Sequence, residues 1–259
     1  MTRGRPLLLL GLALAGGCRG TLSPLSNKLK VGEESYVVLA ADGEGGKGDL
    51  FAAAPASGTP FQVTFTRVDE RAPALSHDGA LLAFLRSATP TDTAGASIVI
   101  LNLINGAERR VPAPAGVEAL RWTPDGAALL ARTPAGMLRT PAPPAALAFA
   151  PVPEAERAAA DSLFRVLLGD PPAGEAKPCA DGTGVCAWLA SGDTVRLSAT
   201  GSDPLGWSGD SVGYFEDGTL TIRPLVGGKT RVIRWDRLSH PRQPTWFAGT
   251  RIARDSALH

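Results

Sequence analysis

Several segments of the chain share one order of hydrophobic and polar positions. Each begins with an apolar or Trp anchor, passes through a polar turn centred on Asp-Gly or a close relative of it, and ends in an apolar run of strand length. That order predicts a β-hairpin, because Asp-Gly favours tight turns and the flanking runs suit paired strands. The segments are residues 73–87, 120–133, 205–218 and 244–255, with a weaker copy at 177–193.

The residues after each hairpin also follow a common pattern. Residues 96–112 and 218–235 each read as a strand, a turn containing Asn-Gly or Gly-Gly, and a second strand, and residues 34–65 read as strands joined by Gly-containing turns. One unit is therefore four short antiparallel strands in roughly 30 to 55 residues, which is typical of a propeller blade. The sequence predicts an all-β fold, a β-propeller of four-stranded antiparallel blades.

The two ends of the chain complement each other. Residues 243–259 contain the first hairpin of a blade with little room for outer strands, whereas the N-terminal segment has later strands but no opening hairpin. Joined, they make one blade, and this closure removes unpaired strand edges. With units near residues 72, 118, 178 and 203 the count is five blades. Six blades remain an alternative, if the termini form separate degenerate blades.

One segment departs from the strand pattern and predicts a helical insertion at about residues 153–169. Pro153 suits a first helical turn, Glu154 and Glu156 suit the positive helix end, and Gly169 suits the C-cap. Two interpretations are open: an insertion packed on the ring, or a lid or partner-binding helix over one face.

The N-terminus has the layout of an export signal. Arg3 and Arg5 precede an uncharged apolar run that is too short for a membrane span and ends at "LAGGC". That ending resembles the bacterial lipobox, although Ala15 stands where Leu is commonest. The resemblance implies a signal peptide at 1–17 and lipidation of Cys18. We expect residues 18–30 to form a flexible tether and residues 31–259 to form the propeller. The alternative is an ordinary secretory signal cut beside Cys18.

Charge and cysteine usage bound the function. Removing residues 1–17 takes away two of the 26 basic residues and leaves 24 against 25 acidic ones, so a nucleic-acid partner is not expected.

Cys179 and Cys186 flank an Asp-Gly turn that places both sulfurs on facing strands, and an oxidising periplasm would let them pair. Two buried thiols are the alternative.

No catalytic constellation emerges from the sequence. "GGKT" at 227–230 lacks the first glycine and the helix of a phosphate loop, and "GWSGD" around Ser208 is not a nucleophile elbow. His77, His240 and His259 show no zinc spacing. We therefore expect no enzyme, no cofactor and no metal.

The repeated aspartates and glycines are interpreted as turn residues. An Asp side chain accepts hydrogen bonds from backbone NH groups one or two residues on, and Gly follows where φ is positive. Trp122, Trp207 and Trp246 sit at equivalent repeat positions and are expected to wedge between neighbouring blades. The turn residues are Asp78, Gly79, Asp125, Gly126, Asp181, Gly182 and Asp210.

A basic stripe near the C-terminus is the candidate partner surface. Its members are cationic apart from one aromatic residue, and such a stripe suits an acidic partner, anionic lipid or glycan. A solvated outer edge whose charges block edge pairing is the alternative. The residues are Arg223, Arg231, Arg234, Trp235 and Arg237.

The repeat resembles a known family. "WTPDG" at 122–126, with "SIVILNL" at 97–103 and "GAERRV" at 106–111, is similar to the WD40-like PD40 repeat of TolB-type propellers. The resemblance covers about residues 31–255 and is strongest at 72–133 and 203–250. It implies a propeller, but this chain lacks the N-terminal α/β domain of TolB, and fold does not fix function.

Together these features predict a lipid-anchored envelope propeller that acts as a non-catalytic protein-binding scaffold. We expect a monomer that faces the periplasm or the cell exterior and binds an envelope protein; Arg19 after the lipidated cysteine favours the outer membrane. The alternative is a periplasmic propeller that binds or processes glycans. A third reading is a degenerate paralogue with a purely structural role.

Overall fold

The structure is a computed structural model. The signal segment, Cys18 and most of the tether lie outside the residues that it describes, as does the chain after Gly249. It describes residues 25, 28–54, 60–92, 95–165, 174–189, 192–208, 211–217, 219–225, 230–234, 238–247 and 249.

The first sheet unites the two ends of the chain. Its strand order is β19-β1-β2-β3, so the innermost strand comes from the C-terminal part and the other three from the N-terminal part. This confirms the predicted shared blade and excludes separate terminal blades. A short 3₁₀ turn, Glu44–Gly46, joins two of its strands. The strands are β1 (Tyr36–Asp42), β2 (Gly48–Ala53), β3 (Phe61–Gln62) and β19 (Ser239–Phe247).

The second and third sheets are single-segment blades. Each is four-stranded and antiparallel, with the strands in sequence order. The second comprises β4 (Asp69–Leu75), β5 (Leu81–Ser87), β6 (Ser97–Asn102) and β7 (Glu108–Pro112). The third comprises β8 (Ala119–Trp122), β9 (Ala128–Thr133), β10 (Gly136–Pro141) and β11 (Ala150–Pro151).

The fourth and fifth sheets complete the set of five among the described residues. The fourth has three described strands, and the fifth has four. The fold is therefore an all-β propeller with one short α-helix, as the sequence predicts. These strands are β12 (Gly174–Pro178), β13 (Val185–Leu189), β14 (Thr194–Ser198), β15 (Ser202–Ser208), β16 (Ser211–Glu216), β17 (Thr219–Pro224) and β18 (Arg231–Arg234).

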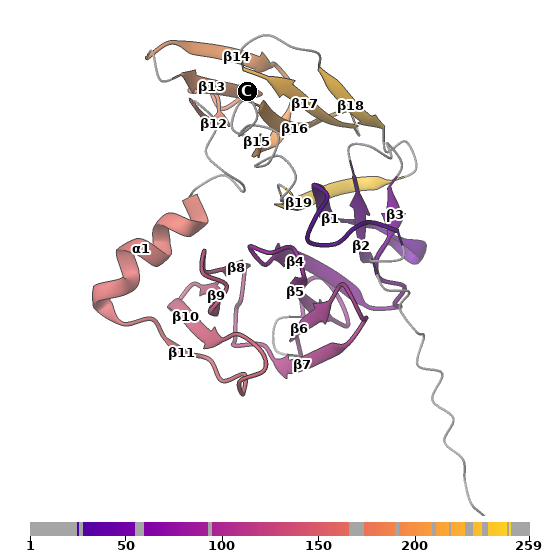
Figure 1. Cartoon of the computed structure of the whole chain (residues 1–259), viewed down its shortest axis with the longest axis vertical. Helices are drawn as coiled ribbons and strands as arrows, with labels where there is room; N and C mark the ends of the chain where they lie inside the picture. Colours follow the sequence, from indigo (N-terminus) through magenta and orange to yellow (C-terminus); the bar gives the residue numbers. More distant parts are fainter. Residues whose placement is uncertain are drawn as a thin grey trace, which may run out of the picture.

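The sheets follow one another around a centre, with β4, β8 and β19 on the inner side (Figure 1). Inner strands of neighbouring sheets pack together: β19 with β4, β4 with β8, β12 with β15, and β15 with β19. Among the described elements, β8 and β12 make no comparable contact. The described ring is thus continuous across four of its five sheet boundaries.

Period-two alternation builds the core between sheets. In β1, Tyr36 and Val38 pack toward the second sheet with Phe84, whereas Val37 and Leu39 pack toward the fifth sheet. Because successive side chains of a strand point to opposite faces, one strand serves two neighbours. Trp122 belongs to the core between the second and third sheets, as expected of a wedge.

The helix α1 (Glu154–Arg165) lies along one side of the third sheet (Figure 1). It begins one residue after Pro153, and the predicted continuation to 169 lies outside the described residues. Ala160, Leu163 and Phe164 pack on Leu130, Met137 and Val152. No helix in the part of the chain that the structure describes combines the length and apolar character needed to cross a membrane.

Candidate functional site

The repeated turns lie at the far ends of the innermost strands and hold themselves together. Asp78 Oδ1 accepts from Ser76 Oγ at 2.5 Å and from Ala80 N at 3.0 Å. Asp125 Oδ1 makes the same pair of bonds, with Thr123 Oγ1 at 2.5 Å and Ala127 N at 3.0 Å. These carboxylates are engaged locally, in bonds that stabilise the turn.

The third turn follows the same scheme. Asp181 accepts from Thr183 N at 2.9 Å and pairs with Arg196, and these bonds, the backbone bond first, lower its pKa to about 2. The turn glycines have positive φ: 68° at Gly79, 68° at Gly126 and 75° at Gly182. Asp210 lies outside the described residues.

The disulfide lies beside this third turn. Cys179 and Cys186 are joined to each other and both are buried. The pairing crosses the β12–β13 hairpin, in which Lys177 faces Cys186. Of the two sequence interpretations, the structure therefore contains the bonded one.

The opposite side of the propeller, where the innermost strands begin, is the strand-start face. Because β4 and β19 run away from it toward the repeated turns, it carries none of them. It is formed by the start of β4 and β19, the turn between β1 and β2, and the segment 63–68 between β3 and β4. The polar residues of the strand-start face therefore do not belong to the repeated turns.

Two equivalent bulges shape this face. In β4 the register slips between Arg71 and Ala74, and in β19 it slips in the segment that contains Gln243. Ala72 and Gln243 both have φ of 52°, and Gln243 Oε1 accepts from Ala72 N at 2.7 Å, which ties the two inner strands together. Bulges re-aim side chains and are over-represented beside functional sites.

These bulges were not predicted from the sequence, although the sequence contains a signal for them. A Pro follows the bulge residue in each case, Pro73 and Pro244, and β15 has a third register shift around Pro204. Pro lacks the NH needed for a central ladder and is tolerated at bulges. A Pro at one position of three inner strands therefore marks the bulge.

Asp42, at the end of β1, joins two side chains of β19. His240 Nδ1 lies 2.7 Å from Asp42 Oδ2, and Arg242 Nη1 donates to Asp42 Oδ1 at 2.7 Å. The Arg242 hydrogen bond is the main reason that the pKa of Asp42 is lowered. His240 is 82% exposed on its side chain, so this cluster faces solvent.

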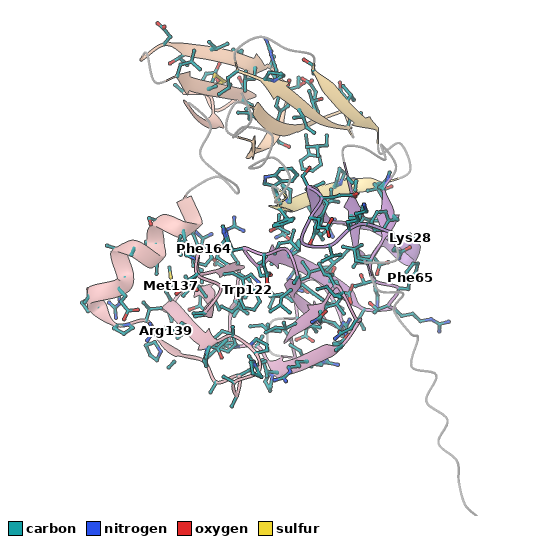
Figure 2. All side chains as sticks on the ribbon, viewed as in Figure 1. Lys28, Phe65, Trp122, Met137, Arg139 and Phe164 are labelled. Atoms are coloured by element: carbon teal, nitrogen blue, oxygen red, sulfur yellow. A yellow bond between two sulfur atoms is a disulfide. The ribbon has the colours of Figure 1, made fainter. Side chains whose placement is uncertain are left out.

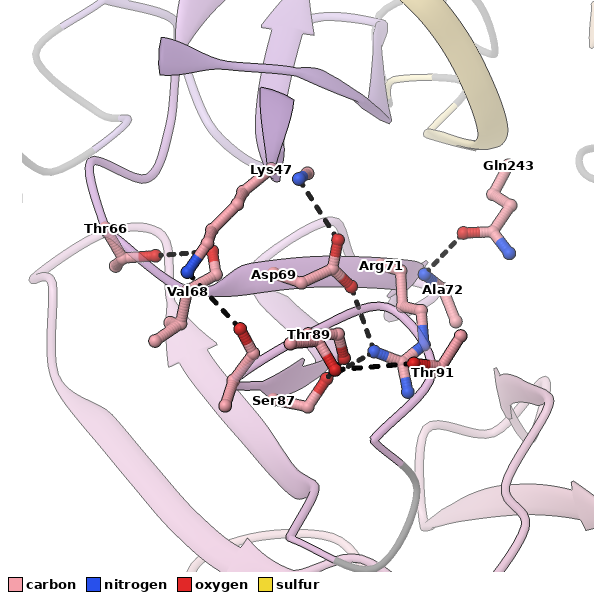
Figure 3. Close-up of polar contacts among 12 residues, drawn as sticks. Lys47, Thr66, Val68, Asp69, Arg71, Ala72, Ser87, Thr89, Thr91 and Gln243 are labelled. Carbon is pink, nitrogen blue, oxygen red and sulfur yellow. Dashed lines mark hydrogen bonds and ion pairs between the residues drawn. The ribbon is translucent and has the colours of Figure 1, made fainter. Parts of the chain in front are cut away.

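Asp69 links the first and second sheets on the same face (Figure 3). Gly48 N donates to its Oδ1 at 3.1 Å, and Arg71 Nη1 donates to its Oδ2 at 2.9 Å and to Ser87 Oγ at 2.6 Å. Lys47 Nζ donates to the carbonyl oxygens of Arg67 at 2.7 Å and Ala88 at 3.3 Å. This network holds the segment before β4 in place.

Two carboxyl groups lie deeper. Glu70 is fully buried and accepts from Arg86 Nε at 2.8 Å, and Asp49 accepts from Gln62 at 2.9 Å. Burial is the main cause that raises the pKa of both. Clustered carboxylates could serve acid–base chemistry, but Asp42, Asp69 and Glu70 each bind an arginine. Within the described ranges, no three His, Cys, Asp or Glu residues gather in a way that could hold a metal ion.

The basic stripe is divided by the fold. Arg223, in β17, donates to the carbonyl oxygen of Leu197 at 2.7 Å and so bridges the fifth and fourth sheets. Arg231 and Arg234 lie in β18, the strand at one edge of the fifth sheet. Trp235 and Arg237 lie outside the described residues.

A cavity of about 320 Å³ lies between α1 and the third sheet. Leu130, Val152, Ala160 and Leu163 line it, and the ion pair between Arg139 and Glu156 lies at its edge. Figure 2 shows Met137 and Phe164 between the helix and the sheet. The helix thus packs on the ring, while a small apolar space remains beneath it.

No family model matches the chain, and no curated protein matches it. Among solved structures, TolB from Acinetobacter baumannii is similar over 80% of this chain and 53% of its own, at 19% identity and TM-score 0.37. A putative TolB from Agrobacterium tumefaciens is similar over 76% and 60%, at 14% identity and TM-score 0.38. A chain of a nidogen/laminin complex is similar over 81% and 80%, at 12% identity and TM-score 0.37. The chain spans little more than half the length of the two TolB chains.

Proposed function

We propose that this protein is a non-catalytic scaffold of the bacterial cell envelope, lipid-anchored at Cys18, that binds an envelope protein through its strand-start face. The anchor, the periplasmic orientation and the outer-membrane location follow from the lipobox-like "LAGGC" and from Arg19. Stable anchoring takes more than one acyl chain, which lipoprotein modification supplies.

The main support for the binding proposal is that Phe65 is exposed to solvent on a segment whose backbone is held in place. Phe65 is 65% exposed and lies on the segment between β3 and β4. Lys47 fixes the backbone of that segment through Arg67. An aromatic side chain on a preorganised segment is a typical anchor for a protein partner, because little conformational entropy is lost on binding.

The polar residues on the same face as Phe65 support a protein partner. Asp42, His240 and Arg242 supply exposed or half-buried polar groups on the same face. An interface commonly consists of an apolar anchor surrounded by a polar rim. The repeat turns on the opposite face, by contrast, use their carboxylates internally.

Site-specific photo-crosslinking in living cells tests the partner surface. A photoreactive amino acid replaces Phe65 in one strain and Ile104 in another. Ile104 is 52% exposed but lies in the β6–β7 turn on the opposite face, so it is a matched control. We expect one envelope protein to be captured from position 65 and not from position 104. Equal capture from both positions, or none from position 65, would overturn the proposed surface.

Affinity measurements with the captured protein sharpen the test. Phe65→Asp should weaken binding by about 10-fold to 100-fold, since loss of an aromatic anchor costs about 1.4 to 2.8 kcal/mol. Ile104→Asp should leave the affinity within about twofold. If polysaccharide and no protein co-purifies, the glycan-binding alternative takes the place of this proposal.

Lipid anchoring is tested separately. Radiolabelled palmitate should enter the native protein and not Cys18→Ala, and the variant should move from the membrane fraction to the soluble periplasm. Label in the variant, or none in the native chain, would refute the anchor while leaving the binding surface to its own test.

A further inference from the structure

Three arginines lie on the face of the third sheet that α1 covers. Arg121 in β8 is paired with Leu130 in β9, and Leu130 is paired with Arg139 in β10. Arg121 and Arg139 therefore lie in one row across the sheet, with Leu130 between them. Arg132 lies two residues beyond Leu130 and projects to the same side. Leu130 packs with Ala160, Leu163 and Phe164, which identifies this side as the helix-covered one.

Within the part of the chain that the structure describes, only one of these three arginines forms an ion pair with a carboxylate. Arg139 pairs with Glu156 of α1. Among the described residues, no carboxylate lies within ion-pair distance of Arg121 or Arg132. Instead, both guanidinium groups lie over the ring of Phe164, with Cζ 6.0 Å from the ring centroid for Arg121 and 5.2 Å for Arg132.

Arg121 is placed unfavourably for a structural role. Its Nε is buried and has no hydrogen-bond partner. Burial, with a smaller contribution from the charge of Arg132, lowers its pKa to about 10, so it remains a cation at neutral pH. Arg121 as a whole is half-buried. A cation that is partly removed from water without an acid partner destabilises a fold, and an apolar residue of similar volume is often at least as stable there. A bound negative charge would stabilise Arg121 and Arg132, and the described residues do not supply one.

We infer that Arg121, Arg132 and Phe164 form a binding site for a small anion that carries a phosphate or carboxylate group. Arg132 is exposed and meets the ligand from solvent. Arg121 donates from the more buried position, where a charge-assisted hydrogen bond is stronger. Phe164 contacts both guanidinium groups through cation–π interactions, which use no NH donor, so the NH groups can donate to the anion. This inference is independent of the proposed partner surface, because the site lies on the helix-covered face of the third sheet.

Thermal unfolding and titration calorimetry test this site. The purified protein is titrated with inorganic phosphate and, separately, with succinate, against sodium chloride at equal ionic strength. At a phosphate or succinate concentration ten times its Kd, the unfolding midpoint should rise by about 3 to 6 °C, because only the folded state binds. The two titrations decide whether phosphate or carboxylate is preferred. A midpoint that rises no more than in chloride with both anions would overturn the inference.

Variants separate an anion site from a structural arginine. Arg121→Met should unfold at the same or a higher temperature without phosphate and should lose the anion-dependent rise. A structural role predicts instead a lower midpoint in every buffer. Arg157→Gln is the matched control, because Arg157 is an exposed α1 arginine that pairs with Glu154. It should keep the full anion response.

Arg132→Gln provides a second, independent test of the anion site. Because the side chain of Arg132 is exposed, the variant should fold as the native protein does. It should weaken anion binding by about tenfold or more, which corresponds to the loss of one charge-assisted contact. An anion response of native size in Arg132→Gln, or in a folded Arg121→Met, would refute the site.

Discussion

Tyr36 donates its hydroxyl hydrogen bond to the carbonyl oxygen of Gly79, in the first Asp-Gly turn. Phe247 packs against both residues: its ring centroid lies 5.6 Å from that of Tyr36, and a Cβ on Gly79 would lie 2.7 Å from its ring. Burial raises the pKa of the Tyr36 hydroxyl, which therefore stays a donor. Both ends of the chain, through β1 and β19, are thus locked onto a turn of the second sheet.

This relationship predicts different effects for two equivalent glycines. Gly79→Ala should lower the free energy of unfolding by about 2–4 kcal/mol, because it adds a clash with Phe247 to the strain of a positive φ. Gly126 has the same φ of 68°, but nothing lies within 4 Å of a Cβ built there. Gly126→Ala should therefore cost only about 1 kcal/mol. Urea unfolding of both variants measures the difference, and equal losses would show that the Phe247 contact is unimportant.

The two kinds of carboxyl group on the strand-start side predict opposite pH effects. The pKa of Glu70 is raised above its ordinary value of 4.5, so its contribution to stability is present below that value and is lost as the pH rises through the raised pKa. The pKa of Asp42 is lowered below 3.8, so its contribution is present above that value and is lost as the pH falls.

Unfolding of native protein, Glu70→Gln and Asp42→Asn between about pH 3 and about pH 7 measures these effects. The stability of the native protein relative to Glu70→Gln should fall as the pH rises, whereas its stability relative to Asp42→Asn should grow. Two difference curves with the same sign of slope would contradict the assigned environments.

The disulfide should stabilise the protein moderately. Cys179 and Cys186 are seven residues apart, so the closed loop is short. Loop-closure entropy for such a loop predicts that Cys179→Ser with Cys186→Ser lowers the free energy of unfolding by about 2–3 kcal/mol. The native protein in reducing agent serves as the comparison and should lose a similar amount. No change in either case would argue against a bonded pair in the folded protein.

The packing of α1 on the third sheet is tested by making the same substitution, Ala to Glu, once on its buried face and once on its exposed face. Ala160 is buried against the third sheet, whereas Ala158 is exposed. Ala160→Glu should lower the free energy of unfolding by about 1–3 kcal/mol and speed proteolysis within the helix, because a carboxylate enters an apolar contact. Ala158→Glu should stay within about 0.5 kcal/mol of native. Similar proteolysis of both variants would indicate that α1 is not held on the sheet.

The repeat, the shared blade and the helical insertion could be predicted because each depends on the order of residues within a short contiguous segment. A hairpin requires a turn between two apolar runs, and both are contiguous in the chain, as at Asp125-Gly126. The same holds for the disulfide across the β12–β13 hairpin. Even the pairing of β19 with β1 was predictable, since each end contained strands that the other lacked.

The candidate sites could not be predicted in this way, because they depend on which distant residues meet. Arg242 and Asp42 are 200 positions apart. The two arginines at Phe164 stand out only because no carboxylate among the described residues pairs with them. The sequence by itself determined the hairpins, their turn residues and the blade order, since local backbone preference and period-two alternation act over a few residues. Only the tertiary structure decided which charges are paired, which are buried and which face remains without repeat turns, because Coulomb interaction and desolvation depend on distance in space.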